Sequence, residues 1–384
     1  MSAGSEGPEV FEEQRSRMFG IAYRMLGSVT DAEEVLQDAW LRWQSADRAG
    51  VADPGAFLAR TVTNLCLNQL TSARARREVY VGPWLPEPVL TRIGGHSRLD
   101  DLGPLELAMQ RETVSFALLT LLERLTPGER AAYVLREAFG YSHREVADLI
   151  GTTEANARQL HSRARKRLAD ERVADGRSAA GRPVDGGSAA GRVADRRSAA
   201  ERVADGGSAA GRVADRRSAG RVADGRSAAE PVAGQKPADE GAGERGRRQV
   251  DPVQWRELVE RFLAAAWRGD VAALEAMLVD GVVARADGGG VVNAARNPVE
   301  GAEKVARYLV GVLQRFGGGV VPHFGEANGE PAIIATSEDG IRAVCFVRLD
   351  GDRISRLDFA MNPVKLRFAE RQLSRIGGLS GLGW

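Results

Sequence analysis

The sequence predicts a multidomain protein in which an all-α N-terminal part is joined by a disordered tether to a C-terminal α+β domain. The chain has 384 residues, which is more than one ordinary hydrophobic core accommodates. Helix-capping signals dominate residues 8–169, whereas alternating apolar patterns with D-G turns appear in residues 250–376. Between these two parts, in residues 170–249, a near-decapeptide repeat of the type RVADGRSAAG runs from Arg172 to residue 230.

The composition excludes several classes of protein. Lys and Arg (53) nearly cancel Asp and Glu (52), so local rather than net charge carries information. The two cysteines, Cys66 and Cys345, lie far apart and indicate neither a disulfide framework nor a zinc site. The acidic N-terminus lacks the apolar core of a signal peptide, and no apolar run approaches membrane-spanning length. We therefore expect a cytoplasmic protein with no membrane partner, no metal and no cofactor.

The first helical domain is expected over residues 8–79. The stretch TDAE predicts a capping box in which Thr30 caps the helix and Glu33 reaches back. Asp53 and Pro54 form a good cap and first-turn pair for the next helix. The apolar face of the helix after the capping box is formed by Ala32, Val35, Leu36, Ala39 and Trp43.

A proline-rich stretch, YVGPWLPEPV, begins the linker that we expect over residues 80–110. Proline fixes φ, lacks an N–H and pushes the preceding residue toward extended geometry. The stretch is therefore neither a helix interior nor a central strand. Its stiffness suits an extended linker in which Trp84 and Leu85 are anchors for an intramolecular or external partner. The alternative is a rigid loop over the protein's own core.

The clearest local signal is the pair of helices in residues 111–169. Capping boxes at TPGE and SHRE open two helices, and the second of these ends at Ile150 and Gly151. A longer basic helix then starts at Thr152 or Thr153. A short capped helix, a tight turn and a basic second helix are typical of the helix-turn-helix motif.

The second helix of this motif carries the residues expected to contact DNA. Arg suits phosphate and guanine contacts, while Gln159 and Asn156 present amides that read base edges. The alternative is a solvated basic face at the end of a helical bundle. The combination of cap, turn and basic helix favours DNA binding.

Two other helices carry weaker signals. Asn64 and Asn68 precede a cluster of arginines that includes Arg74 and Arg76, a pattern that suits unstacked single-stranded bases and their backbone. A charged helix end explains it equally well. The stretch DAEEVLQDAWLRW combines an acidic rim with tryptophans, which suits docking to a basic partner. Ordinary core packing explains the tryptophans as well.

The repeat and the C-terminal part differ sharply in composition. The repeat has no aromatic residue and buries only Val and Ala, so we interpret it as a disordered tether, with intermittent helix as the minor alternative. After it, the stretches PVQWRELVERFLAAAWRGDVAALEAML and GAEKVARYLVGVLQRF predict three helices. GVVARADGG and GGVVNAA predict strands on either side of a Gly-rich turn, and PAIIATSEDGIRAVCFVRLDGDRISRLDF predicts paired strands with D-G turns.

The order of acidic helix, Asn-containing basic helix, linker and basic helix-turn-helix resembles the extracytoplasmic-function (ECF) sigma factors of bacterial RNA polymerase. The resemblance covers nearly all of residues 8–168. WLPEP at 84–88, DGGG at 287–290 and Asn-Pro at 362–363 narrow it to the SigJ-like subgroup, which carries a SnoaL-like C-terminal domain. Val291 and Val364 stand where that subgroup carries Lys and Asp.

The resemblance implies a role for each segment. Sigma region 2 corresponds to residues 8–79, region 4 to residues 111–169, and the SnoaL-like regulatory cone to residues 250–376. The polymerase-binding residues would be Glu33, Glu34, Asp38 and Trp40. The −10 element of the promoter would be bound by Asn64, Asn68, Arg74 and Arg76, with Asn64 in the pocket for a flipped base. The −35 element would be read by Arg158, Gln159, Ser162 and Arg163. The regulatory contact between linker and cone would involve Trp84, Leu85, Pro86, Asp287, Gly288, Gly289, Gly290, Asn362 and Pro363.

We therefore expect a sigma factor that binds core RNA polymerase and promoter DNA, and whose C-terminal domain modulates initiation without catalysis. No anti-sigma factor can be inferred from the sequence. Two alternatives stay open. One is a one-component helix-turn-helix regulator that senses a ligand, and the other is an enzyme fused to a DNA-binding module. For the enzyme, His323 and Asp287 are the only catalytic candidates.

Overall fold

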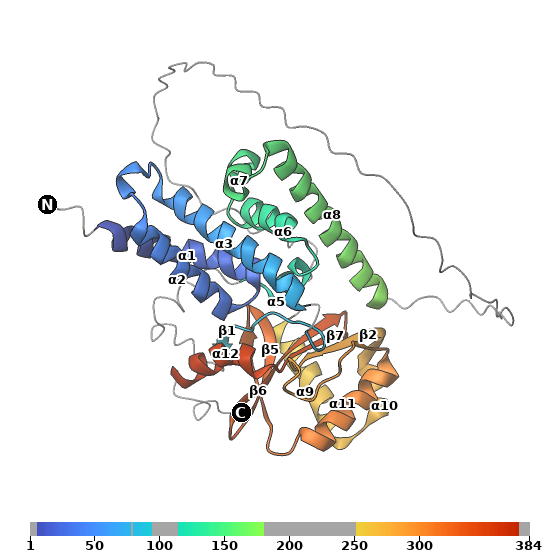
Figure 1. Ribbon diagram of the computed structural model, residues 1–384. Coiled ribbons are helices and arrows are strands. Elements are labelled where there is room, and N and C mark those ends of the chain that lie inside the picture. Colours follow the sequence, from blue (N-terminus) through green and yellow to red (C-terminus); the bar gives the residue numbers. More distant parts are fainter. Residues whose placement is uncertain (1–5, 78–79, 94–113, 180–250, 376–384) are drawn as a thin grey trace, which may run out of the picture. The chain divides into compact units, whose positions relative to one another are not determined.

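The computed structural model describes residues 6–77, 80–93, 114–179 and 251–375 (Figure 1). Residues 94–110 of the predicted linker and residues 180–249 of the predicted tether lie outside the described residues. Within the described part of the chain, no helix has the length and apolar character needed to cross a membrane.

Three long helices and one 3-10 turn form the first helical group. Their bounds are α1 Glu6–Leu26, α2 Val29–Ser45, η1 Arg48–Gly50 and α3 Pro54–Arg77. The predicted apolar face of α2 is confirmed, because all five of its predicted members are buried. The predicted start of α3 is also confirmed, since Asp53 Oδ1 accepts a hydrogen bond of 3.0 Å from the Ala56 N–H.

The predicted cap of α2 is wrong. The helix begins at Val29, and the cap is Ser28, whose hydroxyl accepts from the Asp31 N–H at 3.1 Å. Thr30 lies inside the first turn instead, where its N–H donates to Glu87 Oε2 at 3.0 Å. The sequence predicted that Glu33 would accept the hydrogen bond of the Thr30 N–H. In the structure Glu87, far along the chain, accepts it instead.

The second helical group contains α5 Phe116–Leu122, α6 Pro127–Tyr133, the π-helical turn η2 Val134–Ala138, α7 His143–Ile150 and α8 Glu154–Ala179. Both predicted capping boxes are confirmed, at Thr126 with Glu129 and at Ser142 with Glu145. Gly151 closes α7 in the left-handed region at a φ of 70°.

Helix α8 continues to Ala179, so residues 170–179 are not the disordered tether that the composition predicted. The extra residues, DERVADGRSA, are mostly fair or good helix formers. Extending a helix that is already nucleated adds one hydrogen bond for each residue fixed, so these residues avoid the cost of nucleation.

The C-terminal part combines four helices with a mixed sheet. The helices are α9 Pro252–Arg268, α10 Val271–Met277, α11 Ala302–Phe316 and α12 Pro363–Arg375. The strands are β2 Leu278–Asp287, β3 Val299–Glu300, β4 Val321–Ala327, β5 Glu330–Ser337, β6 Gly340–Asp350 and β7 Arg353–Ala360. The three predicted helices and the paired strands with D-G turns are confirmed.

The strand order is β1-β4-β5-β6-β7-β2-β3, and only β2 and β7 pair in parallel. Strand β1, Leu90–Ile93, belongs to the predicted linker, for which the sequence predicted no strand. It lies at the sheet edge and pairs with β4, with Leu90 opposite Ala327. The linker therefore contributes a strand to the C-terminal sheet.

The predicted strand GGVVNAA is wrong. The N–H groups of Val291 and Val292 both donate to the Gly288 carbonyl, at 3.1 and 3.0 Å, which makes a turn. Gly289 and Gly290 have φ values of 61° and 73°, and this left-handed backbone directs the chain out of the sheet. Pairing resumes only at the two-residue strand β3.

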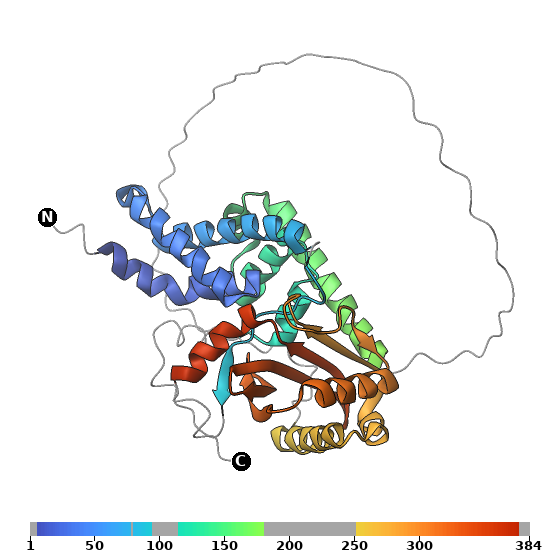
Figure 2. The same cartoon turned by 60° about the horizontal axis from the view of Figure 1, so that its bottom comes forward.

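Helices lie on both sides of the sheet (Figure 2), and each face buries a different apolar cluster. Ile333, Cys345 and Leu357 pack on one face with residues of α9, α10 and α11. Alternate residues along the strands, including Phe346, point to the other face and pack with Leu85 and α12. There the ring of Phe116 in α5 stacks on Phe346 with centroids 3.8 Å apart.

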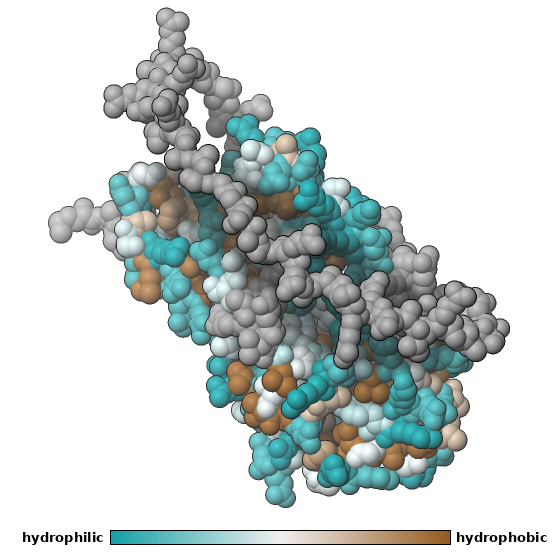
Figure 3. Space-filling view, turned by 45° about the vertical axis from the view of Figure 1, so that its right-hand side comes forward, coloured by the Kyte–Doolittle hydropathy of each residue, from teal (hydrophilic) through white to brown (hydrophobic). Residues whose placement is uncertain are grey.

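Helix α12 also reaches the first helical group, because its Phe368 is buried in the same cluster as residues of α1, α2 and α3. Figure 3 shows small apolar groups separated by hydrophilic residues on the face that it presents. Trp267 and Val321, both exposed, line one cavity of about 450 Å³ together with Leu263, Pro322 and Phe324.

Candidate functional site: the exposed helices and a clasp on the linker

The buried carboxylate of Asp287, at the end of β2, is the centre of a contact between the linker and the C-terminal sheet. It accepts hydrogen bonds from the Tyr80 hydroxyl at 2.5 Å and from the Leu85 N–H at 2.8 Å. The Lys365 ammonium lies 2.6 Å from its Oδ2. One carboxylate thus holds two points of the linker and one residue of α12. We call Tyr80, Leu85, Asp287 and Lys365 the clasp.

Lys365 contacts the linker as well as Asp287. Its ammonium donates to the Leu85 carbonyl at 2.5 Å and lies 3.9 Å from the centre of the Trp84 ring. The charge of Asp287 is therefore balanced by a lysine that also binds the linker. The neighbouring Asn362 donates from Nδ2 to the Tyr80 hydroxyl at 2.9 Å. Leu85 itself is completely buried, as expected of an apolar anchor.

Small residues allow the backbones to approach this closely. A Cβ added to Gly289 would lie 2.2 Å from Asn362 Nδ2, and one added to Gly288 would lie 2.4 Å from the Val292 carbonyl oxygen. A Cβ on Gly290 would lie 3.2 Å from Val81 Cβ. These contacts leave no room for larger residues in the turn. Pro86 is buried, and Pro363 begins α12, whose first turn holds Lys365.

The next acidic residue of the linker, Glu87, binds the first helical group instead. Its buried carboxylate accepts from the N–H groups of Val29 and Thr30 at the start of α2. Its own N–H donates to the Gly27 carbonyl at 2.8 Å. Burial raises the pKa of the Glu87 carboxyl, and hydrogen bonds from the first turn of α2 oppose this rise. Residues 85 and 87 of the linker thus bind two different modules.

The linker is then fixed to the sheet by two amide side chains. Asn328 Oδ1 accepts from the Val89 N–H at 3.1 Å, and Gln372 Oε1 accepts from the Leu90 N–H at 2.9 Å. Gln372 returns a hydrogen bond to the Leu90 carbonyl at 3.0 Å. Because both amides are buried, the polar groups of this part of the linker are satisfied by protein rather than by solvent.

The residues predicted to bind polymerase lie on α2. Glu34 and Asp38 are exposed, whereas Glu33 is half-buried and forms an ion pair of 3.3 Å with Arg371 of α12. Trp40 is half-buried and packs edge-on against Phe11, with ring centroids 5.0 Å apart. Part of the predicted docking surface is therefore occupied by contacts within the chain.

The residues predicted to bind the −10 element lie on α3. Asn64 is half-buried and Asn68 is exposed. Because the two residues are four positions apart, they lie on the same side of the helix. Arg74 and Arg76 belong to the last turns of α3, and their side chains lie outside the described part of the structure.

The four residues predicted to read the −35 element all lie exposed on α8. Their spacing, at positions 158, 159, 162 and 163, places them on one side of the helix. Ala157, Ala164 and Leu168 on the opposite side are buried. The Arg158 guanidinium is already engaged on this surface, since its Nη2 lies 2.8 Å from Glu154 Oε1 in an exposed pair. Exposed pairs of this kind exchange easily for a stronger partner.

The two catalytic candidates are not brought together. His323 lies on β4 and Asp287 on β2, and strands β5, β6 and β7 separate them in the sheet. His323 Nε2 lies 3.0 Å from the Thr336 hydroxyl, and burial lowers the pKa of its imidazole. Asp287 is engaged in the clasp. Neither arrangement resembles an acid–base pair.

Several residues of the site were not singled out from the sequence. They are Tyr80, Glu87, Asn328, Lys365, Arg371 and Gln372. A charged residue between two prolines, as Glu87 is, and a lysine in an otherwise apolar first helical turn, as Lys365 is, were the available signals. Both are residues that are rarely buried without a partner.

Comparisons with known proteins agree with this architecture. The family model for Sigma-70 region 2 matches residues 10–76, and the model for Sigma-70 region 4 matches residues 115–168. The ECF RNA polymerase sigma factor SigJ of Mycobacterium tuberculosis is 33% identical over 310 residues, which cover 81% of this chain and 74% of the relative. The probable ECF RNA polymerase sigma factor SigI of the same species is 32% identical over 154 residues, covering 40% of this chain and 51% of the relative.

The crystal structure of M. tuberculosis SigJ is similar along nearly the whole chain. It shares 28% sequence identity with a TM-score of 0.57, and the match covers 93% of this chain and 97% of that one. The C-terminal mixed-sheet domain has the SnoaL-like fold of that structure. The identity and coverage of these matches establish that the chain belongs to the extracytoplasmic-function sigma factors of RNA polymerase, a non-enzymatic family that binds core RNA polymerase and promoter DNA.

Proposed function

We propose that the SnoaL-like domain of this sigma factor restrains promoter-specific initiation by holding the linker, and that it catalyses no reaction. The observation that carries the proposal is the buried Asp287 carboxylate, which binds Tyr80, Leu85 and Lys365 together. The Gly289 N–H donates to the same carboxylate at 3.1 Å, so four donors occupy its four lone-pair sites, which supports a mechanical rather than a chemical role.

The linker joins the two DNA-binding modules, so the conformational freedom of the linker determines the distance between these modules. Leu85 is bound to the C-terminal sheet and Glu87 to α2, which leaves one residue between the two attachments. A protein with a clasped and a released state responds to any partner that favours one of them. We infer that core polymerase and promoter favour the released state.

The exposed residues of the helices support the roles of the DNA-binding and polymerase-binding surfaces. Glu34 and Asp38 would dock on the polymerase, with Glu33 exchanging Arg371 for a basic partner. Asn64 and Asn68 would bind the melted −10 element. The −35 major groove would be read by Arg158, Gln159, Ser162 and Arg163 of α8. The protein would act in the cytoplasm.

Run-off transcription with purified core polymerase tests the restraint. Asp287→Asn removes the charge that binds Lys365 but keeps the side-chain shape, so we expect it to raise transcription at limiting sigma factor. Asp352→Asn is the matched control, because Asp352 is an exposed carboxylate in the β6–β7 turn. Circular dichroism of both variants checks that the helices remain folded. Equal or lower transcription from Asp287→Asn than from the control would reject the restraint.

A further inference from the structure

We propose that the cavity between the linker and the loop 288–296 binds a small organic carboxylate, and that this ligand stabilises the clasped state. The coupling to the clasp rests on the proposed function, whereas the binding site itself rests on the cavity. Its volume is about 270 Å³, which suits a compact metabolite rather than a drug-sized or polymeric ligand.

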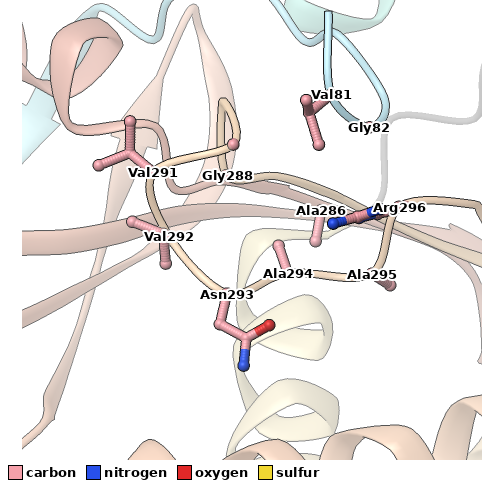
Figure 4. Close-up of a pocket in the computed structure, with 11 residues that line it drawn as sticks. Val81, Gly82, Ala286, Gly288, Val291, Val292, Asn293, Ala294, Ala295 and Arg296 are labelled. Atoms are coloured by element: carbon pink, nitrogen blue, oxygen red, sulfur yellow. The ribbon is translucent and has the colours of Figure 1, made fainter.

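The walls of the cavity come from two modules. Val81 and Gly82 of the linker form one wall, and Ala286 at the end of β2 together with the loop forms the rest (Figure 4). Glycine suits position 82 because its φ of 89° lies in the left-handed region that side chains rarely adopt. A molecule in the cavity would touch the linker and the C-terminal domain at once.

The charge of the lining residues indicates which class of ligand the cavity would bind. Arg296 lines the cavity, and no other lining residue is charged. Figure 4 shows its guanidinium turned toward Ala286, across the space that the cavity occupies. Arg296 is exposed and, within the described part of the chain, has no ion pair or side-chain hydrogen bond, whereas Arg307 of α11 is paired with Glu303 at 2.8 Å. An unpaired guanidinium at such a site is matched by a carboxylate, which accepts two parallel N–H bonds.

The lining also offers some apolar contacts to an organic body, although most of its exposed surface is polar. Val81 and Ala294 present methyl groups, and Figure 4 shows the Ala294 methyl pointing toward the other lining residues, whereas the Val292 side chain lies on the outer side of the loop. A short aliphatic or aromatic carboxylate satisfies both features, because its charged end meets Arg296 while its apolar end contacts these methyl groups. Inorganic phosphate satisfies only the first feature.

The position of the cavity explains how a ligand would act on the linker. Ala286 directly precedes Asp287, and Gly288 and Gly290 line the cavity while belonging to the turn beside the clasp. Release of the linker would remove Val81 and Gly82 from the ligand. A ligand that binds the clasped state more tightly must shift the equilibrium toward that state.

Calorimetric titration of the full-length protein tests the site, with benzoate and butyrate as probes and benzamide, butyramide and phosphate as matched comparisons. We expect saturable binding of at least one carboxylate, with its uncharged amide and phosphate binding more weakly. Arg296→Gln should weaken carboxylate binding about tenfold or more, because a charge-assisted pair is lost. Ala294→Leu should also weaken it by filling the cavity. Arg307→Gln, on neighbouring α11, should bind as wild type.

The outcomes separate this inference from the proposed function. Absence of saturable binding by both carboxylates, equal binding of acid and amide, or wild-type binding by Arg296→Gln each overturns the ligand site. Run-off transcription then tests the coupling, since the bound carboxylate should lower transcription by wild type but not by Arg296→Gln. The effect of Asp287→Asn in the absence of any carboxylate tests the restraint alone, so either conclusion can fail without the other.

Discussion

The side-chain amide of Asn328 donates from Nδ2 to the Tyr23 hydroxyl at 2.7 Å, joining the β4–β5 turn to α1. The same amide donates to the Val114 carbonyl at 3.3 Å, and its Oδ1 accepts from the Val89 N–H at 3.1 Å. One buried side chain therefore contacts the first helical group, the linker and the segment that precedes α5. Among the described residues, Asn328 is also the only non-glycine residue with a positive φ, of 54°.

Replacing Asn328 with glycine should loosen all three contacts. Glycine adopts the left-handed backbone without strain, so Asn328→Gly tests the side chain rather than the turn. Leaving the buried Val89 N–H without its acceptor should lower the free energy of unfolding by about 1–3 kcal/mol, measured by urea denaturation. Asn297→Gly is the control, because Asn297 is exposed. Equal stability of the two variants would show that the amide network is dispensable.

Glu87→Ala should destabilise the start of α2. The variant leaves the N–H groups of Val29 and Thr30 without their acceptor, which should cost about 1.5–3 kcal/mol because hydrogen bonds to a charged group are lost. Hydrogen exchange of these two amides and urea denaturation measure the effect. Glu87→Gln should restore part of it through its carbonyl oxygen, and exposed Glu9→Ala should have little effect. Slow exchange in Glu87→Ala would contradict the capping role.

Replacing Arg158 or Arg163 should relax selection of the −35 element. An arginine that reads a base contributes about 1–3 kcal/mol of discrimination, whereas one that binds phosphate weakens all promoters alike. Transcription of each alanine variant from promoters with single −35 substitutions distinguishes these effects. Arg353→Ala serves as control, since Arg353 is exposed on β7 of the C-terminal sheet. If both variants keep the wild-type rate and the wild-type preference, α8 does not read this element.

Acidification should destabilise the helix-turn-helix through His143. Burial lowers the pKa of its imidazole, and the positive charge of Arg136 and the neighbouring His161 lower it further. His143 Nε2 lies 3.3 Å from His161 Nδ1, and His161 Nε2 lies 2.6 Å from Glu137 Oε1. Arg158 also opposes protonation of His143, whereas Glu154 of the same helix favours it.

The sign of this effect follows from the lowered pKa. Below the ordinary histidine pKa of about 6.5, the unfolded chain binds a proton that the folded chain resists, so stability falls as the pH is lowered. The free energy of unfolding should therefore decrease between pH 7.5 and pH 5.5. His143→Gln should make this decrease shallower. An unchanged slope in His143→Gln would assign the pH dependence to other groups.

Local rules were sufficient for the features that depend on neighbouring residues. The capping boxes at Thr126 and Ser142 each join residues three positions apart, and both are present. The turn at Gly151 needs a positive φ that glycine adopts freely, so the end of α7 was predictable as well. The alternation along β5, β6 and β7 reports burial on both faces of one sheet.

Long-range contacts account for what the sequence did not reveal. Ser28 rather than Thr30 caps α2, because Glu87 binds the Thr30 N–H from another part of the chain. Lys365, the ion-pair partner of Asp287, lies 78 residues away in the sequence, so no local sequence pattern could predict this pair. Strand β1 has only four residues, and its pairing partner β4 lies far along the chain, so no local pattern revealed it.

The position of β1 at the sheet edge has a consequence for the released chain. If the linker were released, the backbone of β4 from Gly325 to Ala327 would lose its pairing partner. An uncovered strand edge is a template for another strand, whether from a second copy of the chain or from a different protein. In the proposed released state, the molecule bound to promoter DNA would also carry an unpaired sheet edge, and renewed pairing of β1 with β4 would protect that edge from self-association.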